Sequence, residues 1–187
     1  MKKTSIKTIK GFKVDLKPFS RDFISNKYLS WINDKDTTRF IDKAKDNTSL
    51  DDLKFFAESM INSDFDYFFA IVYKDKQQHI GNVRLGPIDF HLMKSNFGIL
   101  IGDKSFHGRG VATEVVELIK SFGFNYLNLK QINFPVVEDH IAAMRLYTKT
   151  KFTCLGEINK TFDKNGKSWK LVEWTMNNIE YNKNKNE

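Results

Sequence analysis

The stretch that decides the fold of this chain is Gly98-Ile99-Leu100-Ile101-Gly102-Asp103-Lys104-Ser105-Phe106-His107-Gly108-Arg109-Gly110-Val111-Ala112. It begins as an apolar run typical of a strand, passes through a turn containing glycines, and enters a segment with apolar residues at helical spacing. Backbone N–H groups at a helix N-terminus lack intrahelical acceptors and lie at the positive end of the helix dipole. The stretch therefore predicts either a simple change of chain direction or a cradle for a phosphate group.

Small residues in the loop favour close approach of a ligand to the backbone. Gly108 and Gly110 permit unusual dihedral angles, Ala112 is the next-smallest residue, and Arg109 or Lys104 can add positive charge. The loop lacks the Gly-Lys-Ser/Thr ending of a P-loop and the three-glycine spacing of the dinucleotide fingerprint. These two standard nucleotide sites are therefore excluded.

The segments on either side of the stretch predict a mixed α/β domain. Three strand patterns lead up to the loop as an antiparallel meander, and a strand, a helix and a hairpin with an Asn-Gly turn follow it. We expect a mostly antiparallel sheet of about seven strands, with one central strand-helix-strand crossover and helices on both faces. The predicted strands of the meander and of the part after the loop are 67–73, 79–85, 96–101, 132–137, 152–158 and 169–176.

Length and composition fit one domain, which we place at residues 1–180, with a polar tail at 181–187. We find no apolar run long enough to span a membrane and no apolar core behind the charges of Met1–Ser5, so we expect a cytoplasmic protein. The single Cys154 agrees with a reducing compartment and is expected to be a buried thiol. The formal charge of +7 favours anionic partners without choosing among them.

Two motifs resemble those of a known family. The quoted stretch, continued by Thr113-Glu114, resembles the central motif of the GNAT superfamily of N-acetyltransferases, in particular its RimJ/RimL-like branch. The run from His140 to Phe152 is similar to the family pattern Asn-x-x-Ala-x-x-Leu-Tyr-x-Lys-x-Gly-Phe. The sequence departs from the family at His107, where Gln or Arg is usual, at His140, which replaces the Asn, and at Lys151, which replaces the Gly.

The resemblance implies an acetyl-coenzyme A site made largely of backbone groups. In the family, the cofactor lies in a V-shaped opening between two parallel strands, here expected to be 96–101 and 131–137. The loop backbone holds the pyrophosphate, and the first strand pairs with the pantetheine arm. The residues that the resemblance places at the cofactor are Gly98, Ile99, Leu100, Ile101, His107, Gly108, Arg109, Gly110, Val111, Ala112, Thr113, His140 and Lys149.

The resemblance also implies direct attack of an amine on the thioester, without a covalent enzyme intermediate. Tyr147 matches the family tyrosine that protonates the departing thiolate, and we expect this role, with packing of one helix face together with Leu146 as the alternative. His91, beside Asp89, is a candidate base because histidine titrates in the right range, and a solvated loop histidine is the alternative.

The acceptor is expected to be a small-molecule amine such as a nucleotide-linked amino sugar. The run 28–34 resembles the Tyr-Leu-x-Trp-x-Asn-Asp opening of relatives that acetylate such sugars and, more loosely, of those that acetylate ribosomal protein N-termini. Tyr28 and Trp31 could stack on a base or sugar or simply pack in the core, and Arg84 could pair with a carboxylate or phosphate of the acceptor. A protein N-terminus is the alternative acceptor.

Other classes of function have less support. A nucleic-acid-binding module would need an aromatic-basic motif, which the scattered lysines do not form. An acetyl-coenzyme A sensor without catalysis stays open because of the His107 and His140 departures. The histidines show no metal-ligand spacing, so no metal is expected, and we expect no membrane partner and a monomer or homodimer.

Overall fold

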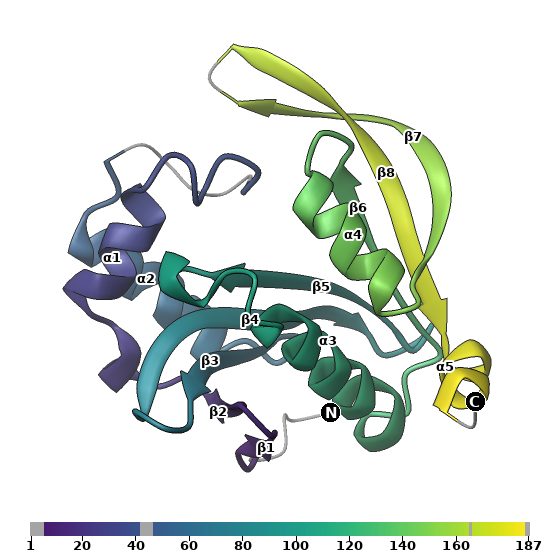
Figure 1. The fold of residues 1–187 in the computed structure, drawn as a ribbon, viewed down its shortest axis with the longest axis horizontal. Coiled ribbons are helices and arrows are strands. Elements are labelled where there is room, and N and C mark those ends of the chain that lie inside the picture. Colours follow the sequence, from purple (N-terminus) through teal and green to yellow (C-terminus); the bar gives the residue numbers. More distant parts are fainter. Residues whose placement is uncertain (1–5, 42–46, 165, 186–187) are drawn as a thin grey trace.

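The computed structural model describes residues 6–41, 47–164 and 166–185 and contains one eight-stranded sheet, in the order β1-β2-β3-β4-β5-β6-β8-β7. Every pair of neighbouring strands is antiparallel except β5 and β6 (Figure 1). This is the mixed, mostly antiparallel sheet expected from the sequence, with the short β1 as an additional strand. The strands are β1 (Ile9–Lys10), β2 (Val14–Pro18), β3 (Tyr67–Tyr73), β4 (Gln78–Asp89), β5 (Lys94–Ile101), β6 (Gln131–Val137), β7 (Thr153–Lys164) and β8 (Lys167–Asn177).

Helices cover both faces of the sheet. On one face, α3 packs its buried valines and Ile119 on the apolar side chains of β3, β4 and β5, and α4 continues this layer over β6 and β8. On the other face, α1 and α2 pack on Phe68, Ala70 and Val72 of β3. We call these the α3 face and the α1 face. The helices are α1 (Asn26–Asn33), α2 (Leu50–Ile61), α3 (Val111–Ser121), α4 (Ile141–Lys149) and α5 (Asn178–Lys185), with shorter turns η1 (Arg21–Phe23), η2 (Lys104–Phe106) and η3 (Phe122–Tyr126).

Local sequence signals explain where the helices begin. The Ser25 hydroxyl accepts a hydrogen bond from the Tyr28 N–H at the start of α1. At the start of α2, Ser49 and Asp52 form a capping box, in which the Asp52 N–H donates to the serine hydroxyl and the Ser49 N–H donates to the carboxylate. Helix α3 instead begins after Gly110, whose left-handed backbone turns the chain into the helix.

Strands β5 and β6 pair at one end only. Their register contains Lys94 opposite Gln131 and Ser95 opposite Ile132, and no pair beyond these among the described residues. From residue 96 to Ile101, β5 therefore has a partner strand only on its β4 side. Because both strands run in the same direction, the opening widens toward their carboxyl ends, where the loop before α3 begins.

Two expectations about individual segments were wrong. We expected a polar tail from Tyr181, but α5 continues to Lys185, and the buried Tyr181 ring packs on Phe124 with centroids 4.9 Å apart. We expected a buried Cys154, but its thiol is exposed, because this part of β7 lies at the edge of the sheet. No helix in the described part of the chain combines the length and apolar character needed to cross a membrane.

Candidate active site

The loop between β5 and α3 is built on two glycines in the left-handed region. Gly108 has φ of 73° and Gly110 has φ of 77°, values that favour glycine over residues with a side chain. No atom lies within 4 Å of the place where a Cβ of Gly108 would be. The loop therefore presents open backbone surface at the wide end of the β5–β6 opening.

Helix α3 leaves its first N–H groups available to a ligand. At the start of this helix, the Glu114 N–H donates to the Gly110 carbonyl at 3.2 Å. In the described part of the chain, no earlier N–H group of the helix has a hydrogen-bond partner. The N–H groups of Val111, Ala112 and Thr113 precede it at the positive end of the helix dipole. Donors of this kind, beside unobstructed glycines, fit the pyrophosphate of coenzyme A.

The side chains of the loop hold its shape. Nε2 of His107 lies 2.8 Å from the Ile101 carbonyl oxygen, and because a carbonyl only accepts, the ring nitrogen donates. This bond ties the loop to the last residue of β5. The Arg109 guanidinium lies over the Phe106 ring, 5.6 Å from its centroid. Both side chains were expected to contact the phosphate. In the structure, both contact other groups of the protein.

A turn far away in the sequence supports the same loop. The Glu114 carboxylate accepts hydrogen bonds from the N–H groups of Lys13, at 2.9 Å, and Val14, at 3.4 Å. The Lys13 ammonium donates to the Arg109 carbonyl at 2.9 Å and lies 3.5 Å from the position of a Cβ on Gly110. We call these contacts the β1–β2 latch. Our sequence reasoning missed Lys13, and no local pattern could have found a contact between residues about a hundred positions apart.

Tyr147 lies over the β5–β6 opening. Its ring contacts Phe97 of β5 and Phe134 of β6, with centroids 6.0 and 4.6 Å away, and also Trp174 of β8. These partners are on the α3 face. Burial raises the pKa of Tyr147 well above its ordinary value, so the hydroxyl stays protonated. The structure thus brings a neutral proton donor to the strands that border the opening.

The two ends of α4 differ in their surroundings. His140 precedes the helix and packs against Phe40, with ring centroids 4.7 Å apart. Burial, and then the nearby Arg39 charge, lower the pKa of His140. Lys149 is exposed in the last turn of the helix, nine residues after His140. The two residues therefore lie at opposite ends of α4.

The α1 face beside the opening carries polar side chains from β6 and β8. Directly opposite residues of these strands share a face, so Asn133 lies with Thr175, and Pro135 with Glu173, on the face opposite Tyr147. The Asn133 amide donates to the Glu173 carboxylate at 2.8 Å. Among the ion pairs of the described residues, none involves Glu173. Sequence reasoning missed this carboxylate because it has no motif.

The residues that were expected to contact the acceptor substrate contact other parts of the protein. Arg84 lies on the α1 face opposite Gly98, but its guanidinium bonds the largely buried Asp66 carboxylate at 2.6 and 2.7 Å. Tyr28 and Trp31 are only 2% and 6% exposed and pack around the His79 ring. Both rings therefore pack in the core, and their contact with an acceptor stays a prediction.

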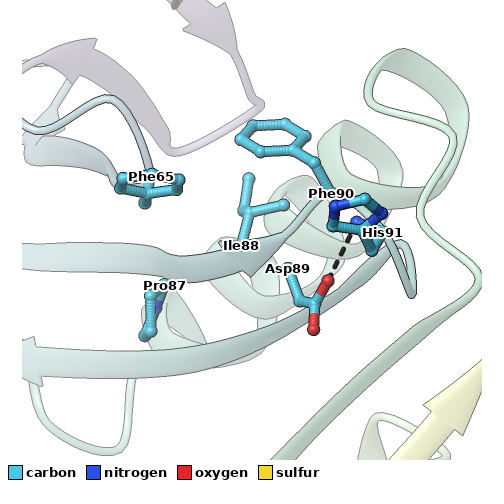
Figure 2. A pocket seen from close by; sticks show the side chains of 6 residues that line it. All are labelled: Phe65, Pro87, Ile88, Asp89, Phe90 and His91. Atoms are coloured by element: carbon cyan, nitrogen blue, oxygen red, sulfur yellow. Dashed lines mark hydrogen bonds between the residues drawn. The ribbon is translucent and has the colours of Figure 1, made fainter. Parts of the chain in front are cut away.

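His91 lies in the β4–β5 turn, at the closed end of the opening. Figure 2 shows it beside Asp89, whose carboxylate accepts the His91 N–H at 2.9 Å. The turn lines an open recess together with aromatic and apolar side chains of the neighbouring segments. Because β5 and β6 separate beyond Ser95, in the direction away from this turn, the structure does not bring His91 together with Tyr147.

The segment after α1 reaches across to the β7–β8 hairpin. The Lys164 ammonium donates to the Thr38 and Ile41 carbonyls at 2.8 and 3.1 Å, and Phe40 packs on Trp169 as well as on His140. In Figure 1 the hairpin projects beyond α4 and bends toward this segment. We call the segment 34–41 with the hairpin tip the arch. Among the described residues, no three His, Cys, Asp or Glu side chains cluster as a metal site would require.

Comparisons with known proteins agree with this geometry. Residues 13–153 match the acetyltransferase (GNAT) domain family. The chain is 28% identical over 109 residues to a Bacillus subtilis protein named "Probable N-acetyltransferase YjcK" and 31% identical over 86 residues to spermidine N(1)-acetyltransferase of Escherichia coli. The alignments cover 58% and 46% of this chain and span only 60% and 46% of the two relatives.

Solved structures share the fold. Spermidine N-acetyltransferase from Vibrio cholerae, crystallised with CoA and spermine, superposes with a TM-score of 0.82 at 20% identity, over 90% of this chain and 98% of that chain. A GCN5-related N-acetyltransferase from Brucella melitensis gives a TM-score of 0.82 at 15% identity, over 96% of this chain and 82% of that chain. At these identities the likeness concerns the fold alone.

Proposed function

The chain belongs to the GNAT acetyltransferase family, and we propose that it transfers the acetyl group of acetyl-coenzyme A directly to a primary amine of a small molecule. The observation that carries this proposal is the β5–β6 opening, with a buried tyrosine over it and a loop of left-handed glycines at its wide end. The Vibrio relative, which shares this fold, was crystallised with CoA. Acetyl-coenzyme A supplies an activated acyl group as its thioester.

The chain's own groups would bind and orient this co-substrate. The N–H groups of 111–113 receive the pyrophosphate, and the unpaired side of β5 from residue 96 to Ile101 offers backbone partners to the pantetheine amides. Gly98 leaves space beside the strand, since no atom lies within 4 Å of a Cβ placed there. His107 and the latch act by holding the loop. Roles for His140 and Lys149 at the cofactor remain part of the proposal.

Tyr147 would act as the general acid. An uncharged amine attacks the thioester carbon, a C–N bond forms, and the C–S bond breaks as the tyrosine proton passes to the departing sulfur. The amine loses its own proton to solvent or to a base. His91 remains a proposed base only through a chain of waters, since it lies at the closed end of the opening. Positioning of the two reactants supplies much of the rate.

The contacts at the site change the class of acceptor that we propose. Pairing of Arg84 with Asp66 removes the cation that was expected to attract an anionic sugar carrier, and the named acceptors of the relatives are polyamines. An amino sugar therefore has less support than a small cationic amine. The RimJ/RimL-like motifs favour acetylation of a protein N-terminus as the alternative function. A protein that senses acetyl-coenzyme A without catalysis is a further alternative.

Coenzyme A binding tests the cofactor half of the proposal. Gly108→Trp should abolish binding measured by calorimetry, because the bulky side chain occupies the open loop surface and strains the backbone. Gly166→Trp is the matched control: Gly166 has the same φ of 73°, also has no atom within 4 Å of its Cβ position, and lies in the β7–β8 turn. Normal binding by the Gly108 variant would refute the phosphate loop.

A panel of amines tests the reaction. Thiol release should be measured with acetyl-coenzyme A and, in turn, polyamines, nucleotide amino sugars and N-terminal peptides. We expect release with small amines. Release seen with peptides alone would favour the alternative acceptor, and binding of coenzyme A without turnover of any amine would favour a sensor.

A further inference from the structure

We propose that the Glu173 carboxylate binds a second, protonated nitrogen of the acceptor, which makes the acceptor an aliphatic diamine or polyamine. This inference rests on the proposed acetyl transfer and assigns one substrate class to it. The carboxylate belongs to β8, the strand next to β6, which borders the opening.

Glu173 faces the side from which an acceptor would approach. Tyr147 packs on Phe134 and Trp174, on the α3 face, and side chains alternate along a strand. Glu173 is the neighbour of Trp174 and therefore points to the opposite, α1 face. Helices α1 and α2 cover this face at β3, and Asn133 and Glu173 on β6 and β8 are only partly buried. The carboxylate is thus one strand away from the opening and open to a ligand.

The charges around Glu173 favour a cation. Its partner in the fold is the neutral Asn133 amide, 2.8 Å away, and none of the described ion pairs includes it. Arg84, on the same face across the opening, is neutralised by Asp66, and Lys170 on β8 pairs with Glu157. A partly buried carboxylate with a neutral partner is stabilised by an ammonium group, which forms a charge-assisted hydrogen bond with it.

An apolar surface adjoins the carboxylate on the same face. Leu171 lies two residues before Glu173 on β8 and is opposite Val137 on β6. Both belong to a cluster with Trp169 and Phe162, which Phe40 of the arch covers. In an aliphatic diamine or polyamine, charged nitrogens are joined by methylene chains. A nitrogen can therefore bind the carboxylate while the chain lies on this cluster. Sugars lack such a chain, and the nitrogen of a peptide N-terminus is not attached to one.

The reaction itself indicates that Glu173 holds a nitrogen other than the reacting one. The attacking nitrogen must be uncharged, and a carboxylate bound to it would favour the protonated, unreactive form. A second nitrogen stays protonated throughout and can keep its bond to Glu173 in both the bound and the transition state. Interactions of equal strength in both states lower KM without raising kcat.

The test compares Glu173→Gln with the wild-type chain. Putrescine and butylamine have the same carbon chain and differ in the second nitrogen. The variant should raise KM for putrescine and spermidine by about 10- to 100-fold, leave kcat within about twofold, and leave both constants for butylamine unchanged. Calorimetric binding of putrescine to the complex with coenzyme A should weaken by the same factor. Glu157→Gln, which removes a carboxylate from the neighbouring β7, is the control.

Four results would overturn the inference. Equal loss with putrescine and butylamine would mean that Glu173 serves the reacting nitrogen or the fold. Unchanged constants for both would mean that the carboxylate does not touch the acceptor. Wild-type turnover of other amines without turnover of any diamine would refute the substrate class while leaving acetyl transfer intact, whereas failure to bind coenzyme A would overturn both proposals.

Discussion

At the scale of single residues, Lys151 occupies a conformation that favours glycine. Its φ is 65°, and it follows α4, where the Lys151 N–H donates to the Thr148 carbonyl and the Phe152 N–H to the Tyr147 carbonyl. These two bonds form a Schellman motif, whose left-handed position is usually glycine. The motif forms with lysine because its side chain is exposed and its backbone hydrogen bonds are the same for any residue.

We predict that Lys151→Gly stabilises the chain. A residue with a Cβ costs about 1 kcal/mol in the left-handed region, and the substitution removes this cost. The free energy of unfolding should rise by about 1 kcal/mol and the melting temperature by about 2–4 °C. Lys149→Gly, inside the last turn of α4, should lower the stability by a similar amount. Denaturant unfolding measures both, and equal effects of the two variants would contradict the prediction.

A second residue-scale prediction concerns the hydroxyl of Tyr147. Tyr147→Phe should lower kcat by about 100-fold or more, because the departing sulfur loses its proton donor, and should leave coenzyme A affinity unchanged. Since burial raises the Tyr147 pKa above its ordinary value of about 10, the wild-type rate should show no loss from tyrosine ionisation below that pH. Tyr181→Phe removes another largely buried phenol, in α5, and should keep full activity. Both expectations are tested by measuring kcat of the wild-type chain and of the two variants over a range of pH.

At the scale of elements, the β1–β2 latch links the N-terminal strands to the phosphate loop. Glu114 of α3 accepts the Lys13 and Val14 N–H groups, and the Lys13 ammonium reaches the Arg109 carbonyl. The lysine therefore adds a positive charge beside the N–H groups of α3. The latch also fixes the position of the loop relative to β2.

We predict that Lys13→Met weakens coenzyme A binding but not pantetheine binding. The ammonium is exposed, so its attraction to a phosphate is screened, and the affinity for coenzyme A should fall by only about 2- to 5-fold. Pantetheine lacks the phosphates and should bind both chains equally. Lys17→Met, on β2, is the control because the Lys17 ammonium bonds Gln77 away from the loop. Equal loss for both ligands would contradict this role, because it would mean that Lys13 affects the binding site beyond the phosphates.

Local patterns predicted those elements whose information lies within a few neighbouring residues. The strand, glycine loop and helix around Gly108 could be recognised because strand alternation, helical spacing and glycine preference are all short-range. The pairing of Arg84 with Asp66, the latch at Lys13 and the burial of Tyr181 depend on which segments meet in space. Such contacts leave no periodic signal in the chain. Glu173 was missed for the same reason, since one acidic residue on a strand has no distinguishing neighbours.

At the scale of the whole molecule, the arch connects two distant parts of the sheet. The segment 34–41 follows α1, which packs at β3, while the β7–β8 hairpin belongs to the opposite edge (Figure 1). Lys164 and Phe40 join these parts, and Phe40 also covers His140 before α4. The arch therefore closes over the carboxyl end of β6 on the α1 face. We propose that this placement favours small amines over folded proteins as acceptors.

We predict that Lys164→Met loosens the arch without unfolding the domain. The ammonium bonds two carbonyls that bring together parts of the chain more than 120 residues apart, so its loss removes the polar link of the arch and leaves the Phe40 packing. Amide hydrogen exchange in peptides covering 34–41 should accelerate by about 5-fold, which corresponds to about 1 kcal/mol, while exchange in β3 and α3 stays unchanged.

The matched variant is Lys167→Met, in the same hairpin, whose ammonium lies over the Trp169 ring at 4.9 Å and donates to no carbonyl of the segment 34–41. It should leave exchange in 34–41 unaltered. If the arch restricts the acceptor, Lys164→Met should also raise the rate with bulky amines relative to butylamine, because the entrance widens while the opening and Tyr147 are untouched. Faster exchange with an unchanged preference would show that the arch is a structural brace, and unchanged exchange would show that Phe40 alone holds it.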